Sequence, residues 1–424
     1  MNERFWNELQ FLKDIAEDVL RRCTVTMKAS YTGEEKDTAL LIPGGDNKYP
    51  SFWVRDCCMN TLCGLVSGED MRRYITIMAS CGQNGPETVY LKNGLEIPPW
   101  TLADHFNYNG RGVWYPGTYD DGDDQGKGDF GFYPPLGDNY WFILLVGQYV
   151  LQTGDKDILN EVFAGYRLKE RLIHAWEGYN TDPEIGMTTS DYERYAIDWG
   201  FTDTIHKSGK LLFSSLLRYN AGLTLAVLLE EQGEDASEYV KKAEILRKAI
   251  VETLYDKESG WFYAATERCH QRDVWGTLYA LWSGILSEED AAKTAKAVAA
   301  EYKNGNNMVS RGYVRQILRS DDAKPGELAW QDLTFYHGKY DWYQNGGYWA
   351  TATGWLFWAL YLADPALAEE AVCDYCSHTR EYAEQGSPFE WKNIETTDLS
   401  GLWYGTSGAL VYQGVLRIAM EEAK

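Results

Sequence analysis

The sequence contains few of the features that mark membrane or secreted proteins. It has 8 cysteines in 424 residues, too few and too widely spaced for the disulfide framework of a small secreted domain. No apolar run approaches the ~20 residues of a membrane-spanning helix. Residues 1–20 show a charged, amphipathic pattern in place of a secretion signal. We therefore expect a cytoplasmic protein with free thiols and no membrane partner.

Positive charge is also scarce. The chain carries 40 Lys and Arg residues against 63 Asp and Glu residues, which gives a formal net charge of −23. Binding to nucleic acid or to an anionic membrane requires clustered cations, so this charge argues against both as main partners. A neutral substrate suits such a chain better than a polyanionic one.

Motifs for metal or cofactor binding are missing as well. No G-x-S-x-G, Walker A or H-E-x-x-H motif occurs, and the 6 histidines lack the spacing of metal ligands. Cys373 and Cys376 have no second pair to complete a zinc site. The segment 120–129 is dense in oxygen donors, but it lacks the register and closing Glu of an EF-hand. We predict no metal and no organic cofactor, with a solvated acidic loop at 120–129 and Ca²⁺ there as the alternative.

Aromatic residues, in contrast, are abundant. They make up 14% of the chain, with 17 Trp and 30 Tyr. Tyr and Trp combine an apolar ring with a polar group, so the surplus suits a large core or a wet cleft lined by rings. Many of these rings lie in loop-like segments that also carry Asp and Glu. Because exposed rings otherwise promote association, this pattern favours a carbohydrate-type cleft.

Apolar residues recur with the 3.6-residue period of a helix in twelve segments. We expect helices at 3–22, 53–67, 69–81, 138–153, 156–176, 210–232, 236–255, 272–284, 287–303, 346–363, 365–385 and 404–422.

Short and long connections alternate between these helices. Tight breaks carry Gly or Asp followed by acidic residues, as expected between adjacent antiparallel helices. Between the pairs lie much longer connections, and loops beyond about 15 residues are uncommon unless they serve a function. This alternation predicts an all-α fold, a single (α/α)6 barrel over residues 1–424, with a cleft at its long-loop end. A helical solenoid or bundle is the alternative, but no fixed-length repeat supports it.

The barrel also predicts which helices lie inside. The segments 138–151 and 351–363 are apolar almost all round, as inner helices should be. The segment 236–255 is amphipathic and charged, as expected of an outer helix.

Glycoside hydrolysis requires two carboxyls that flank the scissile bond, one of them protonated. Asp203 lies behind Trp199 and Phe201, an apolar setting that favours a neutral acid. It could instead be a helix N-cap. Asp198 is the competing acid, and Glu193 a weaker one.

The second carboxyl is predicted at Glu390, between Phe389 and Trp391 on the loop before the last inner helix. It could equally cap a turn or pair with Lys392. Glu395 and Asp398 lie on the same loop and are alternatives.

An adjacent cation and carboxylate, Arg55 and Asp56, follow Trp53. They could form a structural ion pair at a helix start, or they could clamp the hydroxyls of a sugar whose ring stacks on the aromatic side chains. We favour the sugar site. His206, three residues after Asp203, is a possible substrate contact or an ordinary loop histidine.

Three stretches resemble the six-hairpin glycosidases, the group that includes trehalases, glucoamylases and debranching-type α-glucosidases. WVRD (53–56) is similar to the Trp-x-Arg-Asp signature of glucoamylases, and TDTIHKSGKLLFSSLLRYNAGLTLA (202–226) resembles the stretch after the catalytic Asp of trehalase-like enzymes. YQNGGYW (343–349) looks like a loop common in this superfamily. The interval of 187 residues from Asp203 to Glu390 (390 − 203) is similar to the acid-to-base interval of trehalases.

The resemblance implies an α-glycosidase-like O-glycosyl hydrolase on an (α/α)6 barrel. It assigns Trp53, Arg55 and Asp56 to the sugar in the −1 subsite. We predict an inverting hydrolase of a short oligosaccharide or glycoside, with Asp203 as general acid and Glu390 as general base. The cleft would further be lined by Trp199, Asn345, Tyr348 and Trp349.

Other functions on the same barrel remain open at this level. A sugar epimerase would need paired histidines, a phosphorylase would need a cationic phosphate site, and a non-catalytic sugar-binding protein would tolerate loss of either carboxyl. The identity of the sugar, its anomer, endo or exo action and the oligomeric state do not follow from the sequence.

Overall fold

The structure is a computed structural model of the 424-residue chain. It describes residues 1–30, 34–90, 96–107, 112–114, 131–321, 342–393 and 399–424. In these residues it contains twelve α-helices, as the sequence predicts. The acidic segment 120–129 and the alternatives Glu395 and Asp398 lie outside the described residues.

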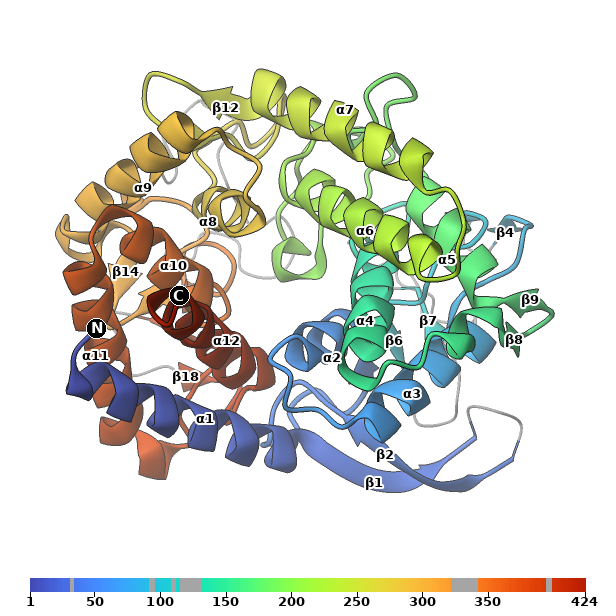
Figure 1. The fold of residues 1–424 in the computed structure, drawn as a ribbon, viewed down its shortest axis with the longest axis horizontal. Helices are drawn as coiled ribbons and strands as arrows, with labels where there is room; N and C mark the ends of the chain where they lie inside the picture. Colours follow the sequence, from blue (N-terminus) through green and yellow to red (C-terminus); the bar gives the residue numbers. More distant parts are fainter. Residues whose placement is uncertain (31–33, 91–95, 108–111, 115–130, 322–341, 394–398) are drawn as a thin grey trace.

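Six helices form an inner ring in which each helix contacts the next, and the ring closes from α12 back to α2 (Figure 1). They are α2 (Val54–Thr61), α4 (Asp138–Thr153), α6 (Phe213–Glu230), α8 (Val274–Ser283), α10 (Thr353–Ala363) and α12 (Gly405–Glu422). Six further helices pack around this ring. They are α1 (Glu3–Cys23), α3 (Gly68–Ile77), α5 (Leu168–Glu177), α7 (Ser237–Leu254), α9 (Glu288–Tyr302) and α11 (Pro365–Glu381).

Burial follows the position of each helix in the two rings. In α10 every residue from Thr353 to Leu360 is buried, so this helix is surrounded by protein. In α7 the buried residues recur every three or four positions and form a single stripe, with solvated charges on the other face. The predicted inner and outer helices are thereby confirmed, and the fold is an (α/α)6 barrel.

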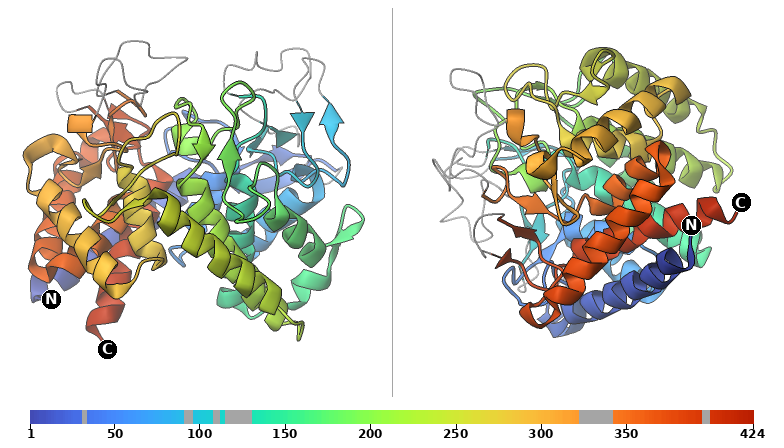
Figure 2. Two further views of the ribbon diagram at one scale, coloured as in Figure 1. Left: turned by 90° about the horizontal axis from the view of Figure 1, so that it is seen from above. Right: turned by 90° about the vertical axis from the view of Figure 1, so that its left-hand side faces the viewer.

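Most of the short antiparallel strands occupy the longer connections, and Figure 2 shows these gathered at one end of the barrel, opposite the two termini. The exception is the hairpin at 162–167, which lies between α4 and α5. One sheet contains β3 (Phe52–Trp53), β6 (His105–Phe106) and β7 (Gly112–Val113). A five-stranded sheet contains β14 (Val309–Ser310), β15 (Tyr313–Val314), β16 (Tyr348–Trp349), β17 (Trp391–Lys392) and β18 (Leu399–Ser400). This sheet brings the connections before α10 and α12 side by side.

The remaining strands form two-stranded pairs. These are β1 (Thr24–Ala29) with β2 (Lys36–Leu41), β4 (Val89–Tyr90) with β5 (Glu96–Ile97), β8 (Val162–Phe163) with β9 (Tyr166–Arg167), β10 (Thr189–Ser190) with β11 (Gly209–Lys210), and β12 (Tyr255–Asp256) with β13 (Trp261–Phe262).

Two predicted helices start later than expected. The segment 156–167 holds a 3₁₀ turn and the β8–β9 hairpin, because Ala164 (φ 46°) and Gly165 (φ 88°) adopt the left-handed conformation of a tight two-residue turn. The helix predicted from 346 begins at Thr353, because 348–349 pair with β15 and β17. Pairing between distant segments overrides local periodicity at both places.

Candidate active site

A small hollow of about 100 Å³ opens at the strand-bearing end of the barrel. Several separate connections and two inner-helix N-termini build its wall. The lining residues are Pro43, Tyr49, Trp53, Arg55, Asp56, Gly200, Phe201, Asp203, Tyr343, Glu390 and Tyr404.

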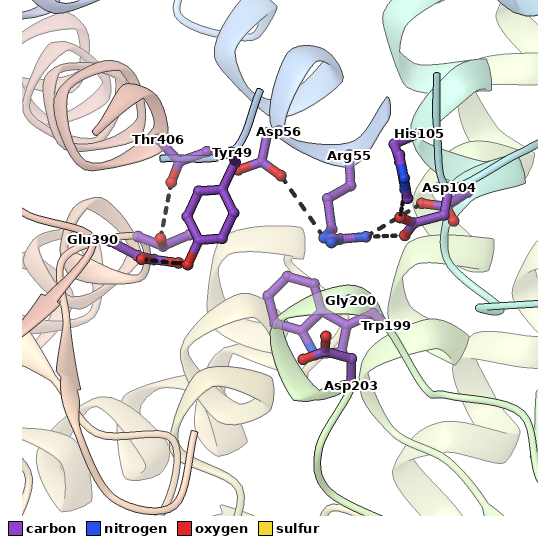
Figure 3. A network of polar contacts seen from close by, with 12 residues as sticks. Tyr49, Arg55, Asp56, Asp104, His105, Trp199, Gly200, Asp203, Glu390 and Thr406 are labelled. Atoms are coloured by element: carbon purple, nitrogen blue, oxygen red, sulfur yellow. Dashed lines mark hydrogen bonds and ion pairs between the residues drawn. The ribbon is translucent and has the colours of Figure 1, made fainter. Parts of the chain in front are cut away.

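Arg55 and Asp56 lie in the first turn of α2 and form the floor of this hollow (Figure 3). The Nη1 atom of Arg55 is 2.5 Å from Oδ1 of Asp104, and Asp56 and Asp138 each have an oxygen 3.9 Å from the guanidinium. All four side chains are buried. The pair is therefore an ion-pair cluster and part of the pocket wall at once, so the two interpretations of the Arg-Asp sequence are compatible.

The carboxylates of this cluster differ in their ionisation. Burial raises the pKa of Asp56 to about 6, although Arg55 and the hydroxyl of Tyr404, which donates at 2.9 Å, act against it. For Asp104, burial also acts to raise the pKa, but Arg55 and His105 outweigh it and hold the value below 3.8. Burial, with the Asp104 charge, raises the pKa of Asp138 well above 3.8. Arg55 thus favours the charged form of Asp104, while burial favours the neutral form of Asp138.

Aromatic rings form the walls above this floor. Trp53 stacks on His105 at 4.2 Å between centroids and meets Tyr49 edge-on at 6.2 Å. The His105 Nδ1 atom lies 2.9 Å from the second oxygen of Asp104. The imidazole therefore ties the Trp53 wall to the charged floor. Such a combination of rings and fixed charges can orient a polyhydroxylated ligand.

Gly200 allows the guanidinium of Arg55 to lie against the turn that carries Asp203. A Cβ at position 200 would be 1.8 Å from Cζ of Arg55 and 1.9 Å from its Nη1. No side chain other than hydrogen fits there without displacing the cation or the turn. The glycine is thus a requirement of the Arg55 site.

We expect Gly200→Ala to lower the free energy of unfolding by about 3–5 kcal/mol, because it separates a buried cation from its carboxylates. Urea denaturation measures this loss. Gly85→Ala is the matched control, since a Cβ there meets no atom within 4 Å. Equal stability of the two variants would contradict the close approach at Gly200.

Asp203 follows a single 3₁₀ turn, Gly200–Thr202, and is half-buried at the pocket wall. The Nε2 atom of Gln344 donates to its Oδ1. The competing acid Asp198 lies outside this wall. One of its oxygens is 2.7 Å from Nζ of Lys207, and the other accepts from the backbone N–H of Ser214 in α6, so Asp198 anchors the turn to the barrel. Glu193 is exposed to solvent.

Glu390 lies on the opposite part of the wall, directly before β17, and is 2% exposed. Tyr49 donates its hydroxyl to the carboxyl, at 2.9 Å from Oε2 and 3.1 Å from Oε1. Burial raises the pKa of Glu390 to about 8, Lys48 and Tyr49 oppose this rise, and Asp56 and Asp203 add to it. Gly401, at φ 61°, makes room for this side chain, because a Cβ there would lie 2.5 Å from that of Glu390.

Five other predicted site residues do not reach the described wall. Trp199 stacks on Phe213 at 3.7 Å, and Trp349 packs edge-on against Trp275, so both rings belong to the core. Tyr348 is buried and donates its hydroxyl to the carbonyl of Asn306. The other two are also buried: His206 stacks on Tyr192 and packs at a tilt against Tyr195, and Asn345 pairs by its backbone with Trp342.

The structure adds wall residues that the sequence reasoning missed. Tyr49, Tyr343, Tyr404, Phe201 and Pro43 line the hollow, and Asp104 and His105 support its floor. Tyr343 precedes the predicted Asn345 by two residues, so the loop was identified but not the side chain that reaches the site. Tyr404 directly precedes the last inner helix. The aromatic residues just before this helix were the sequence feature that could have identified Tyr404 as a wall residue.

Neither a metal site nor a membrane segment is found among the described residues. No group of three or more His, Cys, Asp or Glu side chains there could hold a metal ion. Likewise, none of the described helices combines the length and the apolarity needed to cross a bilayer.

No family model and no curated protein matches the chain. Several solved structures, in contrast, are similar to this chain. A rhamnosidase from Klebsiella oxytoca with rhamnose bound is similar with a TM-score of 0.60 and 11% identity over 98% of this chain, which spans 64% of that protein. A GH63 mannosylglycerate hydrolase from Thermus thermophilus in complex with glucose has a TM-score of 0.57 and 13% identity, covering 95% of this chain and 99% of that one.

A GH78 rhamnosidase from Bacillus sp. GL1 is similar at a TM-score of 0.56 and 12% identity, over 96% of this chain and 34% of its own length. The chain therefore spans less than two thirds of both rhamnosidases. At sequence identities this low, the similarity to these structures shows the fold alone. The (α/α)6 barrel that the sequence resemblance implied is thereby confirmed.

Proposed function

We propose that this protein is an inverting glycoside hydrolase that acts on a short oligosaccharide or glycoside. The observation that carries the proposal is the convergence of Asp203 and Glu390 on one ring-walled pocket above Arg55 and Asp56. The similarity in fold to a mannosylglycerate hydrolase and to rhamnosidases supports a glycosidic substrate.

In the proposed reaction, Asp203 donates a proton to the glycosidic oxygen as the C1–O bond breaks, and the bonding electrons stay on that oxygen. Glu390 accepts a proton from a water that attacks C1 from the opposite face of the ring. Inversion requires space for that water, which corresponds to carboxyls separated by roughly 6.5–9.5 Å.

Burial raises the pKa of Glu390 to about 8, so this carboxyl becomes the carboxylate that a base requires only as the pH rises toward 8. The proposed role therefore implies that activity increases toward alkaline pH. The hydroxyl of Tyr49 contacts both carboxyl oxygens and holds the group in one orientation. Arg55 and Asp56 would bind the hydroxyls of the sugar in the −1 subsite, with the ring of Trp53 beside it.

The rival functions find less support in the described residues. An epimerase needs two histidines at the reacting carbon, whereas neither His105 nor His206 lines the pocket. A phosphorylase needs a cluster of cations near the base, but the two lysines near Glu390 are engaged elsewhere: Lys392 is buried and donates to Ser310, and Lys48 donates to Ser400. A non-catalytic sugar-binding protein would share this pocket with a hydrolase, so only a measurement of turnover distinguishes the two.

A screen of nitrophenyl glycosides and natural disaccharides, with the first-formed anomer followed by NMR, tests the proposal. We expect hydrolysis of at least one glycoside with a product of inverted anomeric configuration. Retention would refute the role of Glu390 as the water-activating base. Binding of sugars without turnover of any glycoside would refute the hydrolase itself.

A further inference from the structure

The orientation of one buried amide beside Asp203 follows from its hydrogen bonds. The Oε1 atom of Gln344 accepts from the backbone N–H of Thr204 at 2.8 Å and from the Thr204 hydroxyl at 2.7 Å. Its Nε2 atom lies 3.5 Å from the carbonyl oxygen of Gly200 and donates to Oδ1 of Asp203. A backbone N–H only donates and a backbone carbonyl only accepts. These two groups fix the amide so that Nε2 faces the carboxyl.

This arrangement is rigid. Gln344 is 1% exposed and Thr204 is 3% exposed, so water does not compete for their hydrogen bonds. The three partners, Gly200, Asp203 and Thr204, all belong to one turn of the chain. The amide therefore moves with the turn and keeps a constant relation to the carboxyl of Asp203.

We propose that Gln344 is a positioning residue that places the catalytic proton of Asp203 on Oδ2 and stabilises the carboxylate left behind when that proton departs. The inference rests on the proposed function. A proton on Oδ1 would point at the Nε2 hydrogen, so the protonated carboxyl carries it on Oδ2. The amide thus selects one of the two oxygens as the proton donor.

The same hydrogen bond changes strength during the reaction. As the proton passes from Oδ2 to the glycosidic oxygen, Asp203 becomes an anion and the bond from Nε2 becomes charge-assisted. An interaction that strengthens toward the transition state raises the rate of the chemical step. Its benefit is confined to substrates whose leaving group needs the proton.

This dependence on the leaving group supplies the test. We compare an alkyl or natural glycoside with the glycosyl fluoride of the same sugar, chosen from the nitrophenyl glycoside screen, since fluoride departs with little need of an acid. For Gln344→Leu and Gln344→Glu we expect kcat on the poor leaving group to fall by about 10- to 100-fold, the range of a charge-assisted hydrogen bond. On the fluoride we expect less than about a threefold change, because that step does not draw on the acid.

Gln316→Leu is the matched control. Gln316 is 1% exposed and its Nε2 donates to the carbonyl of Phe201 in the same turn, without a hydrogen bond to Asp203 among those found. If Gln316→Leu only loosens the turn, we expect it to lower the rates on both substrates by similar factors. Gln344→Glu keeps the size and the acceptor for Thr204, so it serves as the second variant if the leucine variant does not fold.

The outcomes separate the two hypotheses. A selective loss on the poor leaving group in the Gln344 variants, absent in Gln316→Leu, supports the inference. Equal losses on both substrates, or the same selectivity in Gln316→Leu, overturn it and leave the hydrolase intact. If the wild-type protein cleaves neither substrate, the proposed function itself fails.

Discussion

Asp203→Asn is expected to lower kcat/KM on a glycoside with a poor leaving group by about 10²–10⁴-fold, the contribution typical of a general acid. Asparagine has the size of aspartic acid but cannot donate the catalytic proton to the glycosidic oxygen. A glycosyl fluoride needs little protonation, so most of its turnover should survive. Steady-state kinetics on the two substrates measure the difference.

The surviving reaction also reports on the base. With the acid removed, the rate on the fluoride depends on Glu390 alone and should rise with pH through a single ionisation. Burial raises the pKa of Glu390 to about 8, and Asp203 contributes to that rise, so the midpoint in the variant should lie at or slightly below 8. Glu193→Gln, an exposed change on the same connection, is the control. A rate that falls with pH would assign the acid role to Glu390.

Glu390→Gln is expected to make the protein more stable at alkaline pH. In the folded state burial raises the pKa of Glu390 from 4.5 to about 8, so folding favours the protonated form. The stability that this carboxyl contributes is complete below pH 4.5 and is lost as the pH rises to about 8. At about 1.4 kcal/mol per pH unit, the loss is roughly 5 kcal/mol. Glutamine stays neutral throughout this pH range, so the variant does not lose this stability.

Urea unfolding of the wild-type and variant proteins at pH 5 and pH 9 measures this effect. The gain in stability from Glu390→Gln should be small at pH 5 and several kcal/mol larger at pH 9, while glycosidase activity falls. Glu384→Gln, at an exposed position six residues earlier, controls for the loss of one negative charge. A difference that does not change with pH would mean that Glu390 is not held in its neutral form.

Much of the fold and part of the site could be predicted from the sequence because the signals are local. Helical periodicity marks the boundaries of α4 and α12 to within a residue, and the alternation of short and long connections implies paired helices in a ring. The proximity of Arg55 to Asp56 is likewise local. Carboxyls beside rings on long connections, such as Asp203 and Glu390, identified the segments that form the pocket.

What only the tertiary structure decided is which side chain of each segment reaches the pocket. Trp199 and Tyr348 belong to the core, while Tyr343 and Tyr49 line the hollow. Tyr49 meets Glu390 across 341 residues of sequence. Local periodicity carries no information about such a contact, because it depends on how separate connections pack against each other. The sequence alone therefore determined the barrel and the acidic, ring-bearing loops. Packing between distant segments decided which rings are wall and which are core, and how Gln344 meets Asp203.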